Sequence, residues 1–398
     1  MSAFKLMDAP VPLAVWGQDQ IDQGALDQIE VARRLPISVA AAQMPDGHVG
    51  YGLPIGGVLA VRDAVIPYAV GVDIACRMKL SITDMPSDRY EGFKGKLKNA
   101  LSRETCFGVG GEFRKNEKRS HPVMDSPAWD AVPPHIGYLK DKAWAQLGTS
   151  GSGNHFAEWG LLEVKSPDLG VEPGEYVALM SHSGSRGLGA NIAQTYSRLA
   201  KDLTELPPQA RNLAWLSMHS PAGQEYWASM NLAGEYASAN HDCIHREVLK
   251  SAGLKPLLQI ENHHNFAWKE IHNGEEVIVH RKGATPAGEG VLGVIPGSMG
   301  DPGFVVRGRG NAASLCSAAH GAGRAHSRKA ARQTITGSAM RAYLAERGIE
   351  LLAAGVDEAP QAYKRIEEVM EAQKDLVETL AIFWPRMVLM ARGGKAED

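Results

Sequence analysis

An acid and a thiol stand three residues apart at the end of an apolar run, in the stretch AVGVDIACRMKL of residues 69–80. The run before them, from residue 64 to residue 72, has the composition of a buried strand or turn. A carboxylate in apolar surroundings is costly unless it is paired, hydrogen-bonded or bound to a cation. We therefore interpret Asp73 and Cys76 as candidate ligands of a metal ion, placed by one loop.

Four of the 14 histidines share one local pattern, because each ends an apolar segment and stands beside Gly, Ser or Asn. They are His155 in SGNHF, His182 in MSHSG, His264 in NHHNF and His320 in AAHGA. One such histidine alone is more often an ordinary, satisfied residue, but four of them with Asp73 and Cys76 favour a shared cavity. Thiolate, imidazole and carboxylate together suit zinc, manganese or iron, and the thiolate could bridge two ions.

A second pair of histidines, His241 and His245, falls on one face of a probable helix, with Cys243 between them. This spacing resembles helical zinc motifs, but Asp242 stands where a metalloprotease HExxH motif has Glu. We interpret the pair as a polar helix face and exclude it from the site.

His320 differs from the other three histidines because the glycines of HGAGR follow it, and a basic, helix-like segment comes next. Glycines let a backbone approach a phosphate closely, and the amides at a helix start can bind one. A histidine nucleophile at such a place could accept a phosphoryl or nucleotidyl group. The alternative is a Gly-rich helix start with a capping histidine. The nearby GEGVLG (288–293) fits a dinucleotide-binding pattern only in form, because no helix follows it.

The elements that must position these residues are read from hydrophobic periodicity. Helix-like patterns cover 190–204, 223–251, 324–346 and 360–383, and strand-like runs cover 56–70, 174–180, 257–261, 276–281 and 303–308. Because strands and helices do not alternate regularly, we predict an α+β fold rather than a doubly wound sheet. Without a linker or an internal repeat, the chain is predicted to be one large domain, 1–398.

The composition limits the classes of function. With 44% hydrophobic and 22% charged residues, the chain is globular rather than disordered. No apolar run reaches the length of a membrane span, which is about 18 residues or more, so we expect no membrane association and a cytoplasmic location. There the 4 cysteines would stay reduced. A net charge of −3 argues against a protein that coats nucleic acid, although it allows a local basic site.

Eight motifs, in this order along the chain, resemble those of the RtcB family of RNA-splicing ligases. They are PDGHVGYGLPIGGV (45–58), VGVDIACRM (70–78), LGTSGSGNHFAE (147–158), SHSGSRGLG (181–189), HHN (263–265), HRKGAT (280–285), IPGSMG (295–300) and HGAGR (320–324). The resemblance runs from about residue 40 to the C-terminus. It implies an RtcB-like α+β fold of mixed, mainly antiparallel sheets surrounded by helices, with a central two-metal cleft.

The resemblance also implies an activity, which is GTP- and manganese-dependent ligation of RNA in tRNA splicing or RNA repair. Ends that carry a 3′-phosphate or a 2′,3′-cyclic phosphate would be joined to 5′-hydroxyl ends. RNA with such ends is then the partner, and an archease-like activator is a further candidate partner.

The resemblance assigns roles to particular residues. Cys76 would bridge two Mn²⁺ ions, the other ligands being Asp73, His155, His182 and His264, and His320 would be guanylylated. Guanine nucleotide contacts would come from Asn154, Glu158, Asn265, Ser298, His320, Gly321, Ala322, Gly323, Tyr363 and Arg392. Arg186 and Arg324 resemble the arginines of the family that hold phosphates.

Three departures from the family pattern indicate a divergent branch. Gly303 stands where the family has a Ser that contacts the nucleotide, and Arg392 stands where it has a Lys that recognises guanine. Residues 240–242 read NHD instead of Asn-Arg-Gln. Because the Arg fork is longer and planar, the preference for the nucleotide could differ.

Two other functions are compatible with much of this sequence. One is a metal-dependent phosphoesterase that acts on RNA ends without nucleotidyl transfer, and the presence of His320 favours the ligase over it. The other is a non-catalytic RNA-binding protein on an inherited fold. The intact set of candidate ligands argues against that alternative.

Overall fold

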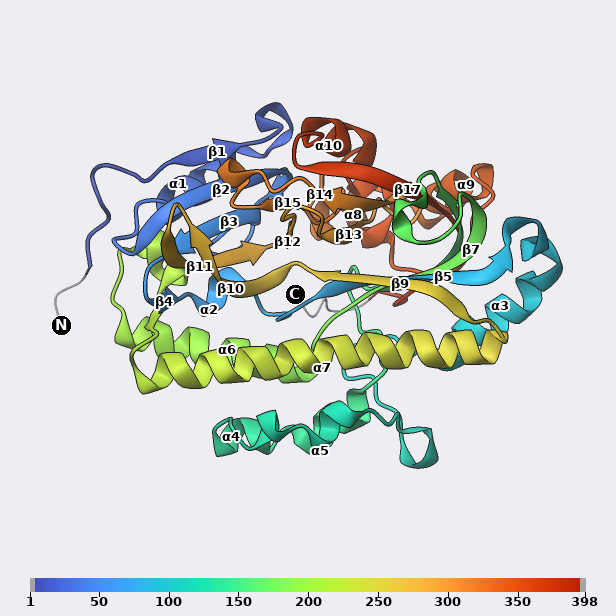
Figure 1. Cartoon of the computed structure of the whole chain (residues 1–398), viewed down its shortest axis with the longest axis horizontal. Helices are drawn as coiled ribbons and strands as arrows, with labels where there is room; N and C mark the ends of the chain where they lie inside the picture. Colours follow the sequence, from blue (N-terminus) through green and yellow to red (C-terminus); the bar gives the residue numbers. More distant parts are fainter. Residues whose placement is uncertain (1–3, 394–398) are drawn as a thin grey trace.

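Two sheets lie side by side in the protein, as shown by a computed structural model that describes residues 4–393 (Figure 1). The predicted domain, 1–398, also includes residues 1–3 and 394–398, which lie outside the described residues. The larger sheet contains, in spatial order, β13 (Leu292–Ile295), β14 (Gly303–Gly308), β17 (Val377–Met390), β6 (Phe156–Val164), β7 (Gly174–Ser183), β5 (Arg77–Pro86) and β9 (Pro256–His263). The smaller sheet contains β1 (Leu13–Val15), β2 (Ser38–His48), β3 (Ile55–Val61), β11 (Glu275–Lys282) and β10 (Asn265–His272).

The remaining strands are short. β16 (Glu350–Ala353) adds to the large sheet beside β17. Two isolated pairs are β12 (Ala284–Pro286) with β15 (Ser317–Ala319) and β4 (Ala64–Val65) with β8 (Leu216–Ser217). Among the described strands, only β1 with β2 and β16 with β17 pair in parallel. The prediction of an α+β fold with mainly antiparallel sheets is therefore confirmed.

Ten α-helices in the described residues surround the sheets. They are α1 (Gln23–Ala32), α2 (Pro67–Val70), α3 (Tyr90–Glu104), α4 (Pro134–Gly137), α5 (Lys140–Gln146), α6 (Arg186–Leu203), α7 (Pro221–Ala252), α8 (Arg328–Thr334), α9 (Gly337–Glu346) and α10 (Ile366–Ala372). The longest, α7, passes beneath both sheets in Figure 1, and α4 and α5 lie below it. No helix between residues 4 and 393 is both long enough and apolar enough to cross a membrane.

Sequence signals mark the two ends of α7. The side chain of Ser220 accepts a hydrogen bond from the amide of Gly223, and Pro221 occupies the first turn, where its missing N–H costs nothing. At the other end Gly253 adopts a left-handed conformation, with φ 68°, that ends the helix. The helix predicted over 223–251 lies wholly within α7.

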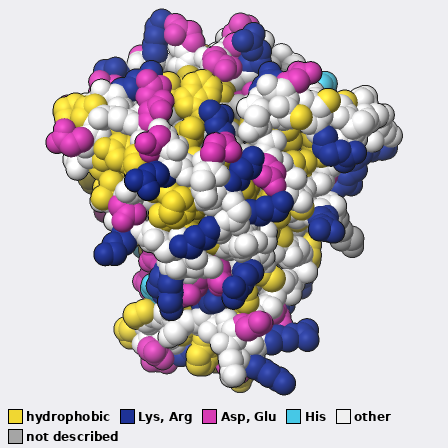
Figure 2. Space-filling view, turned by 90° about the vertical axis from the view of Figure 1, so that its right-hand side faces the viewer, with side chains coloured by type: hydrophobic (Ala, Val, Ile, Leu, Met, Phe, Trp, Pro, Cys, Tyr) yellow, Lys and Arg dark blue, Asp and Glu magenta, His cyan; other side chains and the backbone are white. Residues whose placement is uncertain are grey.

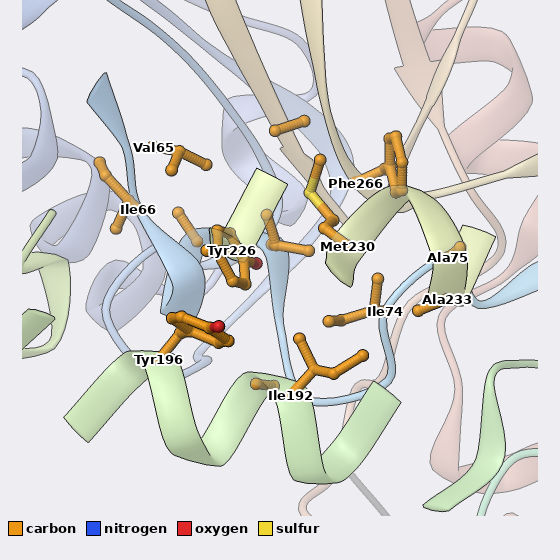
Figure 3. Close-up of a cluster of buried hydrophobic side chains, with 14 of the residues drawn as sticks. Val65, Ile66, Ile74, Ala75, Ile192, Tyr196, Tyr226, Met230, Ala233 and Phe266 are labelled. Carbon is orange, nitrogen blue, oxygen red and sulfur yellow. The ribbon is translucent and has the colours of Figure 1, made fainter. Parts of the chain in front are cut away.

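The apolar core beneath the site holds the candidate ligand loop in place. Ile74 and Ala75 point into a cluster formed with Ile192 of α6, Met230 of α7 and Phe266 of β10 (Figure 3). Both loop residues are fully buried. Because the middle of the loop packs against this core, the residues on either side of it, Asp73 and Cys76, are left to face the opposite direction.

Several predicted elements have different limits in the structure. The prediction of a helix over 360–383 is wrong beyond Ala372, because β17 begins at Val377 and pairs with β14 on one side and β6 on the other. An apolar run such as LVETLAIF fits either a buried helix or a central strand, and pairing on both sides decides for the strand. The helix predicted over 324–346 is two helices, α8 and α9, and the strand predicted over 56–70 is interrupted at Asp63 and ends where α2 begins.

Charged side chains of both signs are mixed on the face shown in Figure 2, where Lys and Arg lie among Asp and Glu. This distribution agrees with the net charge of −3. Any contact with nucleic acid on that face would have to be local.

Candidate active site

The candidate ligands converge because four neighbouring strands of the large sheet, β6, β7, β5 and β9, alternate in direction. The start of one strand and the end of the next therefore lie at the same edge of the sheet. Phe156, at the start of β6, pairs with His182, near the end of β7. Arg77, at the start of β5, pairs with Ser183 of β7 on one side and His263 of β9 on the other. The residues immediately outside these strand ends are the predicted ligands Cys76, His155 and His264.

Two groups of three potential metal ligands meet at this edge and share one thiol. The first group is Cys76, His182 and His264, and the second is Asp73, Cys76 and His155. Within each group the ligand atoms lie within 4.8 Å of one another. Cys76 Sγ is 3.1 Å from His182 Nε2 and 3.4 Å from His155 Nε2. The structure therefore brings all five predicted ligands together, with the thiol in the middle.

The hydrogen bonds of His182 present a lone pair to this cluster. Its Nδ1 lies 3.2 Å from the carbonyl oxygen of Asn154, a contact in which the ring must donate. The unprotonated Nε2 then faces Cys76 and lies 3.2 Å from His264 Nε2. Burial lowers the pKa of both histidines well below the ordinary value, so both are neutral at pH 7. Neutral imidazoles around a thiol fit a transition-metal ion.

Asp73 supplies the negative charge of the cluster. Burial would raise its pKa, but a hydrogen bond from His155 and the nearby charge of Arg186 lower the pKa to about 2. Its Oδ2 lies 2.9 Å from His155 Nε2. The carboxylate is therefore ionised at neutral pH and able to bind a cation.

We expect a Gly184→Ala substitution to weaken metal binding about 10- to 100-fold, the effect typical of disturbing a residue that supports a ligand. A Cβ at position 184 would lie 2.2 Å from Oδ1 of Asp73, so the carboxylate would have to leave its place. Titration of Mn²⁺ followed by electron paramagnetic resonance measures the change. Gly95→Ala in α3 is the matched control, since nothing lies within 4 Å of its added Cβ. Equal affinity in both variants would contradict this geometry.

His320 lies next to the cluster and is oriented by a carboxylate. Its ring centroid is 4.7 Å from that of His264. Oδ2 of the fully buried Asp46 accepts hydrogen bonds from both His320 Nδ1, at 2.7 Å, and the His320 amide, at 3.1 Å. In the tautomer with Nδ1 protonated, Nε2 keeps its lone pair and is the ring atom that is able to act as a nucleophile.

If His320 accepts a nucleotidyl group, as the family resemblance implies, we expect Asp46→Ala to slow that transfer about 100-fold, because the imidazole loses the partner that fixes its tautomer and its orientation. The rate of adduct formation by intact mass measures this effect. Asp168→Ala provides the control, because it removes an exposed carboxylate that pairs with Arg307 at 3.4 Å and does not line the pocket. An unchanged rate in Asp46→Ala would show that Asp46 does not orient His320.

A pocket opens beside His320 and the cluster, and most of the predicted nucleotide contacts line it. These are Asn154, Glu158, Asn265, Ser298, His320, Gly321, Ala322, Gly323 and Tyr363. Arg324 also lines it and donates hydrogen bonds to Glu358 and to the hydroxyl of Tyr363, each at 3.3 Å. The Glu158 side chain is buried in this pocket, and burial raises its pKa well above the ordinary value.

Two predicted contacts, Arg186 and Arg392, do not line the pocket, and neither does Gly303, which stands where the family has a Ser that contacts the nucleotide. Arg186 is buried behind the cluster, where its Nη1 is 3.3 Å from His155 Nδ1. Arg392 is exposed, beyond the end of β17, and Gly303 packs at the start of β14, where its added Cβ would lie 3.2 Å from the Met180 side chain.

The segment after His320 also differs from the prediction. The chain from 320 to 327 is irregular, and α8 begins only at Arg328. Its start is capped by the Ser327 side chain, which accepts from the amide of Ala330. The amides of this helix therefore do not follow His320 directly, although Arg328 itself reaches the pocket.

The excluded pair, His241 and His245, is buried rather than on a solvated polar face. Ser181 Oγ lies 3.1 Å from His241 Nδ1 and 2.9 Å from His245 Nε2. Nearby on α7, Asn240 accepts from the amide of Gly148 at 2.7 Å and so fixes the loop that leads to His155. The NHD segment thus supports the site from behind.

Sequence reasoning assigned no role to several residues that line the pocket or hold its residues. His48 lines the pocket and Asp46 holds His320; both lie in the motif PDGHVG, where alternation of a carboxylate with a histidine was the available signal. Glu358, which binds Arg324, Arg328 and Tyr363, had no signal of its own in the sequence.

Comparison with known proteins agrees with this geometry. The family model described as tRNA-splicing ligase RtcB matches residues 28–143 and 134–391. RNA-splicing ligase RtcB1 of Escherichia coli is 34% identical over 416 residues, which cover 96% of this chain and 97% of that protein. The tRNA-splicing ligase RtcB of Thermococcus kodakarensis is 32% identical over 435 residues, with 91% and 90% covered. The chain belongs to the RtcB family.

Proposed function

We propose that this protein is an RNA ligase that uses GTP and two Mn²⁺ ions to join a 3′-phosphate or 2′,3′-cyclic phosphate end to a 5′-hydroxyl end. The observation that carries the proposal is the placement of His320, oriented by Asp46, beside two ligand groups that share Cys76. The names of the relatives, RNA-splicing ligase and tRNA-splicing ligase, support the reaction class. The manganese comes from the resemblance, because thiolate and imidazole also bind zinc.

The residues of this chain can perform each step. His320 Nε2 attacks the α-phosphorus of GTP, so that an N–P bond forms and pyrophosphate leaves. An oxygen of the RNA 3′-phosphate then displaces His320 and forms an RNA-ppG end. The 5′-hydroxyl attacks the RNA phosphorus of that end and expels GMP, and a cyclic phosphate is first hydrolysed. Bound at Asp73, Cys76 and the three histidines, the ions would neutralise phosphate charge and align the reacting groups.

Glu158 supports guanine as the base. Its buried carboxyl faces the pocket, and guanine offers two N–H donors, at N1 and N2, to such an acceptor. Adenine places an acceptor at N1, which would leave the buried carboxylate unsatisfied. Burial raises the pKa of Glu158, and only the ionised carboxylate accepts both guanine donors, so affinity for GTP should rise as the pH rises through that pKa.

We expect Glu158→Gln to lower the rate of nucleotidyl transfer from GTP about 10- to 100-fold, as for the loss of a hydrogen bond to a charged group. The rate of nucleotidyl transfer from ATP should fall less, so the ratio of the rate with GTP to the rate with ATP should decrease. Intact mass after incubation with each nucleotide measures both. Glu163→Gln, farther along β6, is the control. Retained selectivity in Glu158→Gln would assign guanine recognition to other residues.

Ligation itself tests the function. Two RNA strands, one with a 3′-phosphate and one with a 5′-hydroxyl, are incubated with Mn²⁺ and either GTP or ATP. A joined product that requires GTP supports the proposal. Removal of the 3′-phosphate without joining, under the same conditions, would instead identify a phosphoesterase. We place this activity in the cytoplasm, where cysteines stay reduced. Comparison of ligation with and without an archease-like protein tests the activator.

A further inference from the structure

An exposed aromatic side chain lies on a loop whose two flanking residues, His48 and Ile55, line the pocket, and the proposed reaction does not use it. Tyr51, on the loop between β2 and β3, is 67% exposed. Its ring meets the ring of Tyr68, at the start of α2, edge to face, with centroids 6.2 Å apart. The ammonium group of Lys201, on α6, lies 4.9 Å from the centre of the Tyr68 ring.

A second cation, Arg211, lies on the segment that the Tyr51 loop contacts. Gly52, next to Tyr51, approaches the backbone of Asn212 so closely that an added Cβ would lie 2.8 Å from its carbonyl oxygen. Arg211 precedes Asn212, is exposed, and its positive charge is felt at Lys201. Within residues 4–393 neither Lys201 nor Arg211 forms an ion pair with an acid. We call Tyr51, Tyr68, Lys201 and Arg211 the tyrosine platform.

The backbone under the platform is fixed from two sides. Lys282, which is buried, donates to the carbonyl oxygens of Tyr51, at 2.7 Å, and of Tyr68, at 3.1 Å. On the other side the Gln28 amide both donates to Gly50 O, at 2.6 Å, and accepts from Gly50 N, at 3.0 Å. Tyr51 thus carries a solvent-facing ring on a tightly held loop. Because these contacts already fix the loop, the ring is preorganised for a ligand.

The platform lies within reach of the pocket along two paths. His48 and Ile55, which flank the loop of Tyr51, line the pocket. Gly283, next to Lys282, is so near His320 that its added Cβ would lie 3.2 Å from His320 Cε1. The helix α6 starts at Arg186, beside His155, and Lys201 is 15 residues farther, about 22 Å along the helix axis at about 1.5 Å per residue.

We propose that the tyrosine platform docks a single-stranded segment of the substrate RNA, a few nucleotides away from the end held in the pocket. This inference rests on the proposed function. An exposed aromatic ring stacks on a base of any sequence, and neighbouring cations bind the phosphates on either side. A local site of this kind is compatible with a protein of net charge −3.

Binding of a fluorescent ten-nucleotide RNA with a 3′-phosphate, followed by anisotropy, tests the platform. We expect Tyr51→Ala to raise Kd about tenfold, within the range for loss of one stacked base, and Tyr51→Phe to bind like the unchanged protein. Lys201→Ala should lower the slope of log K against log salt by about 1. Competition by an unlabelled dinucleotide with a 3′-phosphate should be equal in all variants, since it is too short to reach the platform. Tyr138→Ala, which removes a ring that is 84% exposed between α4 and α5 and is not part of the platform, is the control.

The outcomes separate the platform from the reaction. Guanylylation of His320 should be unchanged in Tyr51→Ala, because the ring does not line the pocket. An unchanged Kd for the ten-nucleotide RNA in Tyr51→Ala would overturn the proposal that the platform binds RNA. An equal rise of Kd in Tyr138→Ala would overturn it as well. If Tyr51→Ala leaves this Kd unchanged but abolishes binding of a protein partner, the platform is a protein-binding surface instead. If the unchanged protein neither accepts GMP nor ligates RNA, the proposed function fails, while the Kd values still decide whether RNA binds at Tyr51.

Discussion

His320→Ala is expected to remove the GMP adduct completely from protein incubated with GTP and Mn²⁺. The unchanged protein should gain the mass of one GMP, held by an acid-labile N–P bond, whereas the variant has no nucleophile at that place. Among the described residues that line the pocket, His320 is the only histidine whose Nδ1 contacts a buried side-chain carboxylate and whose ring lies beside the ligand cluster. Loss of such a nucleophile typically lowers the rate about 10⁴-fold or more.

The control for this variant is His326→Ala, which removes an exposed histidine six residues farther along the chain. It should keep the adduct. His320→Ala should still bind Mn²⁺, because neither of the two ligand groups includes His320. A GMP adduct that persists in His320→Ala would place the nucleophile elsewhere and would contradict the proposed reaction.

The sequence singled out the residues that meet at the edge of the large sheet because their local settings are distinctive. A thiol stands three residues from an acid, and each histidine ends an apolar segment beside a Gly, Ser or Asn. The antiparallel pairing that gathers Cys76, His155 and His182 at one edge could not be read from spacing, since the ligands are separated by 79 and 106 positions from Cys76. The resemblance to the family supplied this information in place of geometry.

The errors arose where tertiary contacts decide between equal local patterns. The run from 376 to 383 suits a buried helix as well as a strand, and only its place between β14 and β6 makes it strand. Arg186 is predicted to hold a phosphate, and its guanidinium lies beside His155, a placement that no local pattern could show. The role of Asp46 could not be predicted from the sequence, because its hydrogen-bond partner, His320, is 274 positions away.

Cys76→Ser is expected to abolish tight Mn²⁺ binding and, with it, guanylylation of His320, while the fold remains. Each ligand group loses the same atom, and a neutral hydroxyl does not replace a bridging thiolate. Loss of a residue that supports a ligand weakens metal affinity roughly 10- to 100-fold, and loss of the ligand itself should weaken it at least as much. Metal content after dialysis should fall from two Mn²⁺ per chain, as proposed, to none.

The matched control is Cys243→Ser, because Cys243 is equally buried but lies in the apolar core on α7, away from the cluster. It should keep both ions and the GMP adduct, so that any loss in Cys76→Ser reflects the shared ligand rather than a missing buried thiol. Circular dichroism and the melting temperature of the two metal-free variants should be similar. Two ions still bound to Cys76→Ser would show that Cys76 does not bridge them. If only one ion is lost, the two ligand groups are independent, and His320 should then be guanylylated at a reduced rate instead of not at all.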